Sequence, residues 1–139
     1  SFLSYPAGGG ESVAMLCLRL KTDILEHLAR ECSEKRVMVV CHGHVMRALQ
    51  LELEDLGHDD FIRLDSSKEP VDRILNCQIV WYTRRDPDTL IESPKLVAVR
   101  SVCTHGIVGD YGWRRIQRRR YSNEELMEDV QKYPRHLNG

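Results

Sequence analysis

An apolar run at residues 37–41, followed at once by a histidine and a glycine, limits the folds open to this chain more than any other feature. The run reads Val-Met-Val-Val-Cys and shows no apolar–polar alternation. That pattern is typical of a central strand covered on both faces in a parallel sheet. His42-Gly43-His44 follows as a tight turn, and helical spacing returns over residues 45–56. A buried strand, a glycine turn and a helix in this order predict an α/β layered domain.

The flanking segments add further helices to this prediction. Residues 13–32 carry apolar side chains at helical spacing, and Ser12 is a suitable N-cap for them. Residues 58–64 have the pattern of a short helix. Ser122-Asn-Glu-Glu125 has the spacing of a capping box, which predicts a last helix that ends before Pro134.

Two later strands complete the expected elements. Residues 77–83 and 96–102 are rich in β-formers, with a turn after the first, so we expect them to pair as a hairpin or meander. Residues 104–120 show little periodicity. We divide the chain into an α/β core at 1–103 and an extension of the same domain at 104–139, which holds a basic segment and the last helix.

Composition restricts the class of protein. The 139 residues are 42% hydrophobic and 29% charged, as in one globular domain, and 20 basic residues balance 21 acidic ones. Such a balance argues against a dominant nucleic-acid or membrane role. The five cysteines are widely spaced without a Cys-x-x-Cys pair, and no apolar run approaches the ~20 residues of a membrane span. A reducing, cytoplasmic setting is expected.

The chemistry at His42 points to a phosphoryl group. A side chain at the carboxyl end of a parallel strand faces the crevice where α/β sheets bind ligands. The next helix directs its free N–H groups and its positive dipole end to the same place, and Gly43 lets the backbone approach an anion closely. A histidine that is cationic near neutral pH can donate to phosphate oxygens. The alternative is that His42 only hydrogen-bonds a neighbouring loop.

Three separated motifs resemble the histidine phosphatase superfamily, also called phosphoglycerate mutase-like. The second-histidine motif of that family is similar to residues 39–49, Val-Val-Cys-His-Gly-His-Val-Met-Arg-Ala-Leu. A Gly-Glu-Ser turn that opens a long helix with an arginine corresponds to Gly10-Glu11-Ser12 and Arg19. An asparagine before a late strand corresponds to Asn76. The resemblance runs from residue 5 to about residue 103, and we interpret it as the C-terminal half of the family's fold.

The resemblance implies a fold and an activity. The fold would be a three-layer sandwich with a mostly parallel sheet. Family enzymes move a phosphoryl group onto a nucleophilic histidine in an Arg-His-Gly motif, and the second histidine, here His42, completes the phosphate pocket. No Arg-His-Gly occurs in this sequence, and Thr104-His105-Gly106 comes after the second-histidine motif. The first strand and its nucleophile therefore lie outside this chain. We expect a fragment, or one chain of a split protein, which does not turn over substrate alone.

Other residues are assigned with the alternatives left open. Gly43, His44, Glu11 and Tyr5 are the candidate substrate-binding residues. For Glu11 we favour the alternative that it complements a helix dipole, and Tyr5 could equally be a loop aromatic without further role. Arg19 and Arg47 are interpreted as structural or surface residues on their helices.

No cofactor is expected and no metal site is assigned, although His42, His44, Cys41 and His27 lie near one another in sequence. Residues two apart after a strand point in different directions, and no second ligand pair has metal spacing.

The arginine-rich segment Trp113–Tyr121 holds five arginines between two aromatic residues. It could be a nucleic-acid or phosphate-ligand patch. We favour a solvated arm balanced by the acidic last helix, with a subunit contact as an intermediate option.

The function expected from all of this is phosphomonoester hydrolysis or mutase-like phosphoryl transfer through a phosphohistidine. The partners would be a phosphorylated small molecule and a missing N-terminal half or second chain, with no membrane or nucleic acid, and self-association is left open. The alternative is a non-catalytic scaffold or interaction domain that uses the arginine-rich tail.

Overall fold

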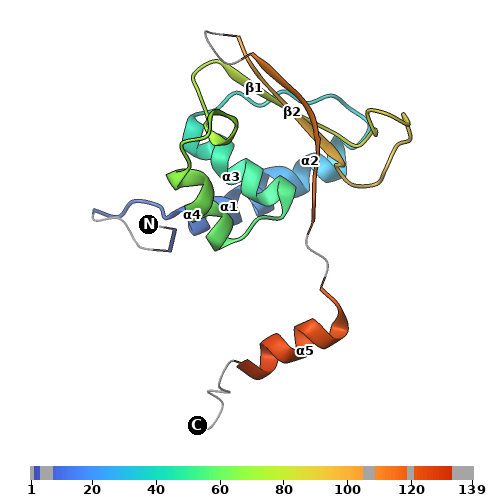
Figure 1. Ribbon diagram of the computed structural model, residues 1–139. Coiled ribbons are helices and arrows are strands. Elements are labelled where there is room, and N and C mark those ends of the chain that lie inside the picture. The colour runs from blue at the N-terminus through green and yellow to red at the C-terminus, as the bar shows by residue number, and fades with distance from the viewer. Residues whose placement is uncertain (1, 4–7, 105–108, 119–120, 133–139) are drawn as a thin grey trace.

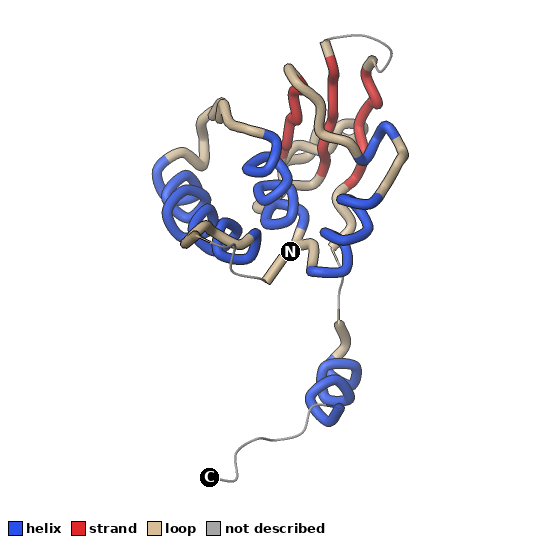
Figure 2. The backbone as a smooth tube through the Cα atoms, turned by 90° about the vertical axis from the view of Figure 1, so that its left-hand side faces the viewer, coloured by secondary structure: helices blue, strands red, loops and turns tan. Residues whose placement is uncertain are grey.

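The computed structural model describes residues 2–3, 8–104, 109–118 and 121–132. Its helices lie beneath a small sheet (Figure 1), and Figure 2 shows the three strands side by side. The helical elements are α1 (Val13–Arg19), η1 (Leu20–Leu25), α2 (Glu26–Glu31), α3 (Gly43–Glu54), α4 (His58–Ser66), η2 (Pro70–Asp72) and α5 (Asn123–Lys132). The strands are β1 (Gln78–Thr83), β2 (Ala98–Cys103) and β3 (Asp110–Arg115).

The first helical run forms where the apolar spacing predicts it. Ser12 caps it, because its Oγ accepts the amide N–H of Met15 at 3.2 Å, which satisfies one of the free donors of the first turn. α1, η1 and α2 follow without a break, and η1 is a π-helical segment. The apolar stripe faces the core, so the predicted helix at 13–32 is confirmed.

The core lies between α1, α3 and α4. Its fully packed members come from all three helices and from the start of η1, and the aromatic side chains of Phe2 and Phe61 close it at one end. The buried members are Leu16, Cys17, Leu20, Ala48, Leu51 and Leu64. Burial of this apolar surface stabilises the helical layer.

The sheet is antiparallel throughout, with strand order β1-β2-β3. The pairing of β1 with β2 confirms the hairpin or meander predicted for residues 77–83 and 96–102. β3 was missed by the sequence because its residues lack alternation, and it pairs with β2 through a register shift between Arg100 and Val102.

The expectation of a mostly parallel sheet is therefore wrong. β1 and β2 are joined by a loop with no crossover helix, and such a connection produces an antiparallel pair.

The segment at 37–41 is not a buried strand, contrary to the prediction. It is assigned no strand, and Met38 and Val40 are 89% and 91% exposed. A β-strand requires a neighbour for its N–H and C=O groups, and no strand within the described residues pairs with this segment. Cys41, expected to be buried, is half-buried for the same reason.

The two faces of the sheet differ. Tyr82, Val99 and Arg114 stand in one cross-strand row that faces α3. Trp81 and Ile79 point to the other face and are 58% and 57% exposed. Within the described residues no helix covers that face, so two layers are present and the expected three-layer sandwich is not seen.

α5 begins at the predicted capping box. The amide of Glu125 donates to Ser122 Oγ at 3.1 Å, and the amide of Ser122 donates to the Glu125 carboxylate at 2.7 Å. Figure 1 shows α5 apart from the helices and strands that form the core. In the part of the chain that the structure describes, no helix is long and apolar enough to cross a membrane.

Candidate functional site

His42 occupies the N-cap position of α3, a helix of 12 residues. Its backbone is extended (φ −86°, ψ 163°), and its carbonyl accepts the amide N–H of Met46 at 2.9 Å. The side chain is exposed and makes no cap hydrogen bond. Within the described residues, the imidazole makes no hydrogen bond to a loop. The structure therefore gives no support to the alternative that His42 only hydrogen-bonds a neighbouring loop.

The first turn of α3 supplies free amide groups beside His42. Gly43 and His44 open the helix, and both are exposed. The first N–H groups of a helix have no partner in the helix itself and carry the positive end of its dipole. A Cβ at Gly43 would lie 3.8 Å from Ile74 Cγ2, so the glycine lies against the segment that follows η2. The structure brings His42, Gly43 and His44 to one helix end.

The other predicted site residues lie elsewhere or cannot be described. Glu11 forms a bidentate pair with Arg19, with Nε–Oε1 and Nη2–Oε2 both at 2.8 Å. The hydrogen bond from Arg19 lowers the pKa of Glu11. The pair joins the Gly-Glu-Ser turn to the first helix, and within the described residues no hydrogen bond or ion pair joins Glu11 to His42. Tyr5 and His105 lie outside the described residues.

Arg47 has the structural role that was one of its two expected interpretations, and its side chain is half-buried. Its guanidinium donates to Gln50 Oε1 at 2.6 Å and to the main-chain oxygen of Asp72, which ties α3 to η2. Burial lowers the pKa of Arg47, and the nearby Asp72 and Asp65 carboxylates oppose that shift.

Sequence reasoning missed a buried carboxylate at the other end of α3. Glu54 is 4% exposed, and it accepts the Tyr82 hydroxyl at 2.9 Å and the Arg114 guanidinium at 3.0 and 2.9 Å. A signal was available, because Glu54 lies three residues after Leu51 and six after Ala48, on the buried face of the helix.

The described arginines of the basic segment contact the body of the protein. Arg114 pairs with Glu54, Arg115 pairs with Asp86 and Asp88, and Arg118 donates to the carbonyls of Leu96 and Leu53. The favoured interpretation, an arm balanced by the acidic last helix, is therefore wrong for these three residues. They hold β3 and the following residues to the sheet and to α3.

Within the described residues, neither the cysteines nor a metal-binding cluster provides a second candidate functional site. Burial raises the pKa of the Cys17 thiol to about 11 and also raises that of Cys41, which makes both weak nucleophiles. No group of three histidine, cysteine or acidic side chains is placed to hold a metal ion in the region that the structure describes.

Comparison with known families places the chain in a class of phosphoryl-transfer proteins. Residues 2–78, more than half of the 139, match the histidine phosphatase superfamily (branch 1). The chain belongs to this superfamily, which is α/β and whose members are generally phosphatases and mutases. The match ends at residue 78, whereas the expected resemblance extended to about residue 103, so it covers the N-terminal part of the chain and excludes β2. Searches of curated proteins and of solved structures return no match.

Proposed function

We propose that this chain serves in phosphomonoester hydrolysis or mutase-like phosphoryl transfer through a phosphohistidine, with His42 as the second histidine of the phosphate pocket. The observation that carries the proposal is the exposed His42 imidazole at the start of α3, beside free amides and Gly43. Membership of the superfamily supports the reaction class. On this proposal residues 2–78 correspond to the part of the family's fold that bears the second histidine.

The chemistry divides between two histidines. A nucleophilic histidine attacks phosphorus, its N–P bond forms, and the P–O bond to the alcohol breaks. The departing oxygen takes up a proton. Water or a second alcohol then attacks phosphorus, the N–P bond breaks, and the attacking oxygen gives up its proton as it takes the phosphoryl group. His42 and the amides at the start of α3 hold the equatorial oxygens, whose negative charge is best met by fixed donors in the transition state. Since the sequence has no Arg-His-Gly, the proposal assigns the nucleophile to a segment or chain outside these 139 residues.

The exposed run at 37–41 supports such a partner. Its residues are apolar and paired with no described strand, and they lead directly into His42. β1 is also an edge strand, and Arg84 just beyond it donates to the Ser33 carbonyl, four residues before the run, at 2.9 Å. A strand that pairs with residues 37–41 would satisfy their backbone groups and bring its own side chains beside His42.

Phosphate binding is tested by site-resolved NMR on the full chain. We expect inorganic phosphate to shift the imidazole resonances of His42 and the amide resonances of Gly43 and His44. His42→Ala should weaken the titration at these amides by about tenfold, because a charge-assisted hydrogen bond is lost. His27→Ala, an exposed histidine on α2, is the matched control and should leave the titration unchanged.

Two outcomes would contradict the proposal. If phosphate leaves the resonances of His42 and Gly43 unmoved, the phosphate role fails and the non-catalytic scaffold becomes the better description. If the isolated chain hydrolyses p-nitrophenyl phosphate robustly and His42→Ala abolishes that turnover, the nucleophile lies within these residues and the two-part site is wrong.

A further inference from the structure

A surface pocket of about 570 Å³ lies between α3 and the residues that follow α4. Arg47 reaches it from α3, and the other charged lining residues, Asp65, Lys68 and Arg73, come from the end of α4 and the segment around η2. Three positively charged side chains and one carboxylate therefore line the same pocket. Positive charge gathered in a concave surface attracts anions more strongly than the same charge spread over a flat one.

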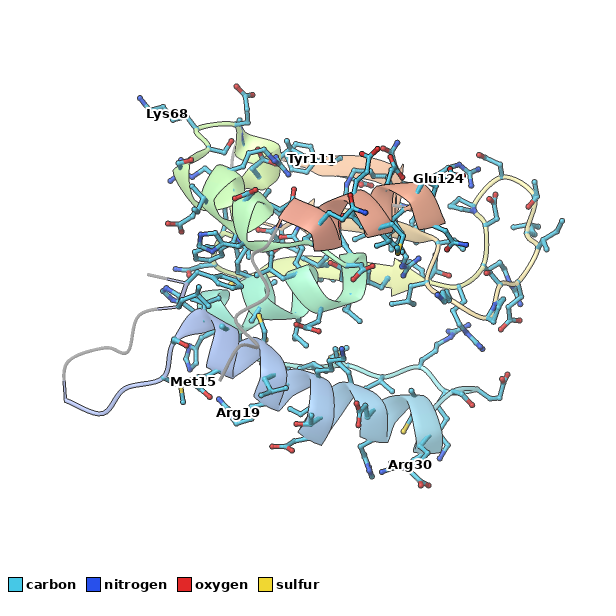
Figure 3. All side chains as sticks on the ribbon, turned by 90° about the horizontal axis from the view of Figure 1, so that it is seen from below. Met15, Arg19, Arg30, Lys68, Tyr111 and Glu124 are labelled. Carbon is cyan, nitrogen blue, oxygen red and sulfur yellow. The ribbon has the colours of Figure 1, made fainter. Side chains whose placement is uncertain are left out.

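The three cations differ in how they are held. Arg47 is fixed at the wall by Gln50 and the Asp72 carbonyl. Lys68 and Arg73 are exposed and have no hydrogen-bond or ion-pair partner within the described residues. Figure 3 shows Lys68 extended at the edge of the molecule, so it forms the outer rim. One fixed guanidinium and two cations without partners in the described residues can donate hydrogen bonds to an oxyanion from several sides.

Two neighbouring carboxylates, those of Asp72 and Asp65, act on Arg47 and offset part of the positive charge around the pocket. The Asp72 carboxylate accepts the Ser67 hydroxyl at 2.6 Å and lies 4.0 Å from Arg63. Asp65 lines the pocket itself, and its charge favours the charged form of Arg47. The negative charge of Asp65 therefore repels a bound anion. Removal of Asp65 should strengthen anion binding, whereas removal of one of the cations should weaken it.

The pocket adjoins the His42 end of α3 without including it. Ile74 lines the pocket and also lies against Gly43. Gly43 and Arg47 are four residues apart on one helix face, roughly 6 Å along the axis. His42 and His44 do not line the pocket.

We propose that the pocket formed by Arg47, Lys68 and Arg73 is an anion site, separate from that at His42, for a small molecule that bears a phosphate group. The proposal does not depend on the role of His42. Inorganic pyrophosphate is a suitable probe, because it is compact and has several oxyanion acceptors.

The test is titration calorimetry with pyrophosphate at low salt on the full chain carrying His42→Ala, so that binding at the start of α3 is weakened and the pocket contributes most of the signal. Adding Lys68→Gln together with Arg73→Gln should weaken the Kd at least about tenfold, because two charge-assisted contacts are lost. Adding Asp65→Asn should tighten it about threefold through loss of repulsion. Lys95→Gln, a lysine in the loop before β2, should leave it unchanged.

Three results would overturn the proposal. These are the absence of pyrophosphate binding at millimolar concentration, an unchanged Kd in the double variant, and an equal loss in Lys95→Gln, which would indicate a general charge effect. Circular dichroism melting of each variant confirms that the fold is kept, which the exposure of the substituted side chains leads us to expect. Because the His42 titration described above is read at Gly43 and His44, failure of one proposal is distinguishable from failure of the other.

Discussion

At the scale of single residues, the buried Glu54 carboxylate connects the two layers of the structure. It receives a hydroxyl from β1 and a guanidinium from β3, each across more than 25 residues of chain. The two contacts contribute differently to the stability of the fold. Arg114 is 53% exposed, so water screens its charge and the pair contributes little on its own. The hydrogen bond from the half-buried Tyr82 to an ionised acceptor is the stronger of the two.

Glu54→Ala should lower the free energy of unfolding by about 2 kcal/mol, since the Tyr82 hydroxyl then loses its acceptor in a buried setting. Arg114→Ala should cost less than about 1 kcal/mol. Urea denaturation of the full chain measures both. Glu52→Ala, on the same helix, is the control, and an equal loss in that variant would show that general helix effects explain the result.

The pH dependence of stability follows from the same contact. Burial, and then the charge of Glu54, raises the pKa of Tyr82 well above its ordinary value. Above pH ~10 the unfolded chain releases this proton while the folded chain keeps it, so stability falls as the pH rises. We expect Tyr82→Phe to reduce the loss of unfolding free energy between pH 8 and 11 by up to about 1 kcal/mol. Parallel curves for the two proteins in urea titrations would contradict this account.

At the scale of elements, two helices begin with similar serine caps but differ in their surroundings. Ser12 is buried and opens α1, which packs in the core. Ser122 opens α5, whose residues 123–128 are exposed. A cap in a packed helix affects the folding of the whole molecule, whereas a cap in an exposed helix affects only that helix.

Ser12→Ala should therefore destabilise the protein by about 1 kcal/mol in thermal or urea unfolding. Ser122→Ala serves as the matched comparison, and it should reduce the helical signal in circular dichroism while the unfolding midpoint stays unchanged. A shift of the midpoint by Ser122→Ala as large as that of Ser12→Ala would mean that α5 belongs to the cooperative core.

At the scale of the whole molecule, apolar side chains remain exposed along the unpaired segment at residues 37–40 and on one face of the sheet. Residues 37–40 are between 47% and 91% exposed, and Ile79 and Trp81 are more than half exposed. Exposed apolar strands favour association with another chain. Met38→Lys together with Val40→Lys should reduce concentration-dependent association in analytical ultracentrifugation and leave the urea midpoint unchanged within about 0.5 kcal/mol. Leu18→Lys, at an exposed site on α1, is the control, and an equal reduction there would count against a specific role for the unpaired segment.

The sequence by itself determined the local elements. The first helical run, α3, α4, α5 and the β1–β2 hairpin all lie where periodicity and capping residues predict them, because those signals depend on near neighbours in the chain. The family was also evident in the sequence, and the superfamily match confirms it. The tight turn predicted at His42-Gly43-His44 is absent, because His42 is the N-cap of α3 and the helix already begins at Gly43.

Only the tertiary structure decided which surfaces those elements share. Pairing direction, the exposure of residues 37–40, the burial of Glu54 and the gathering of Arg47, Lys68 and Arg73 at one pocket all depend on contacts between distant segments. An apolar run reads the same whether a neighbouring strand covers it or not. Its sequence therefore predicted a buried strand, and only the arrangement of the other strands shows the run to be unpaired within the described structure.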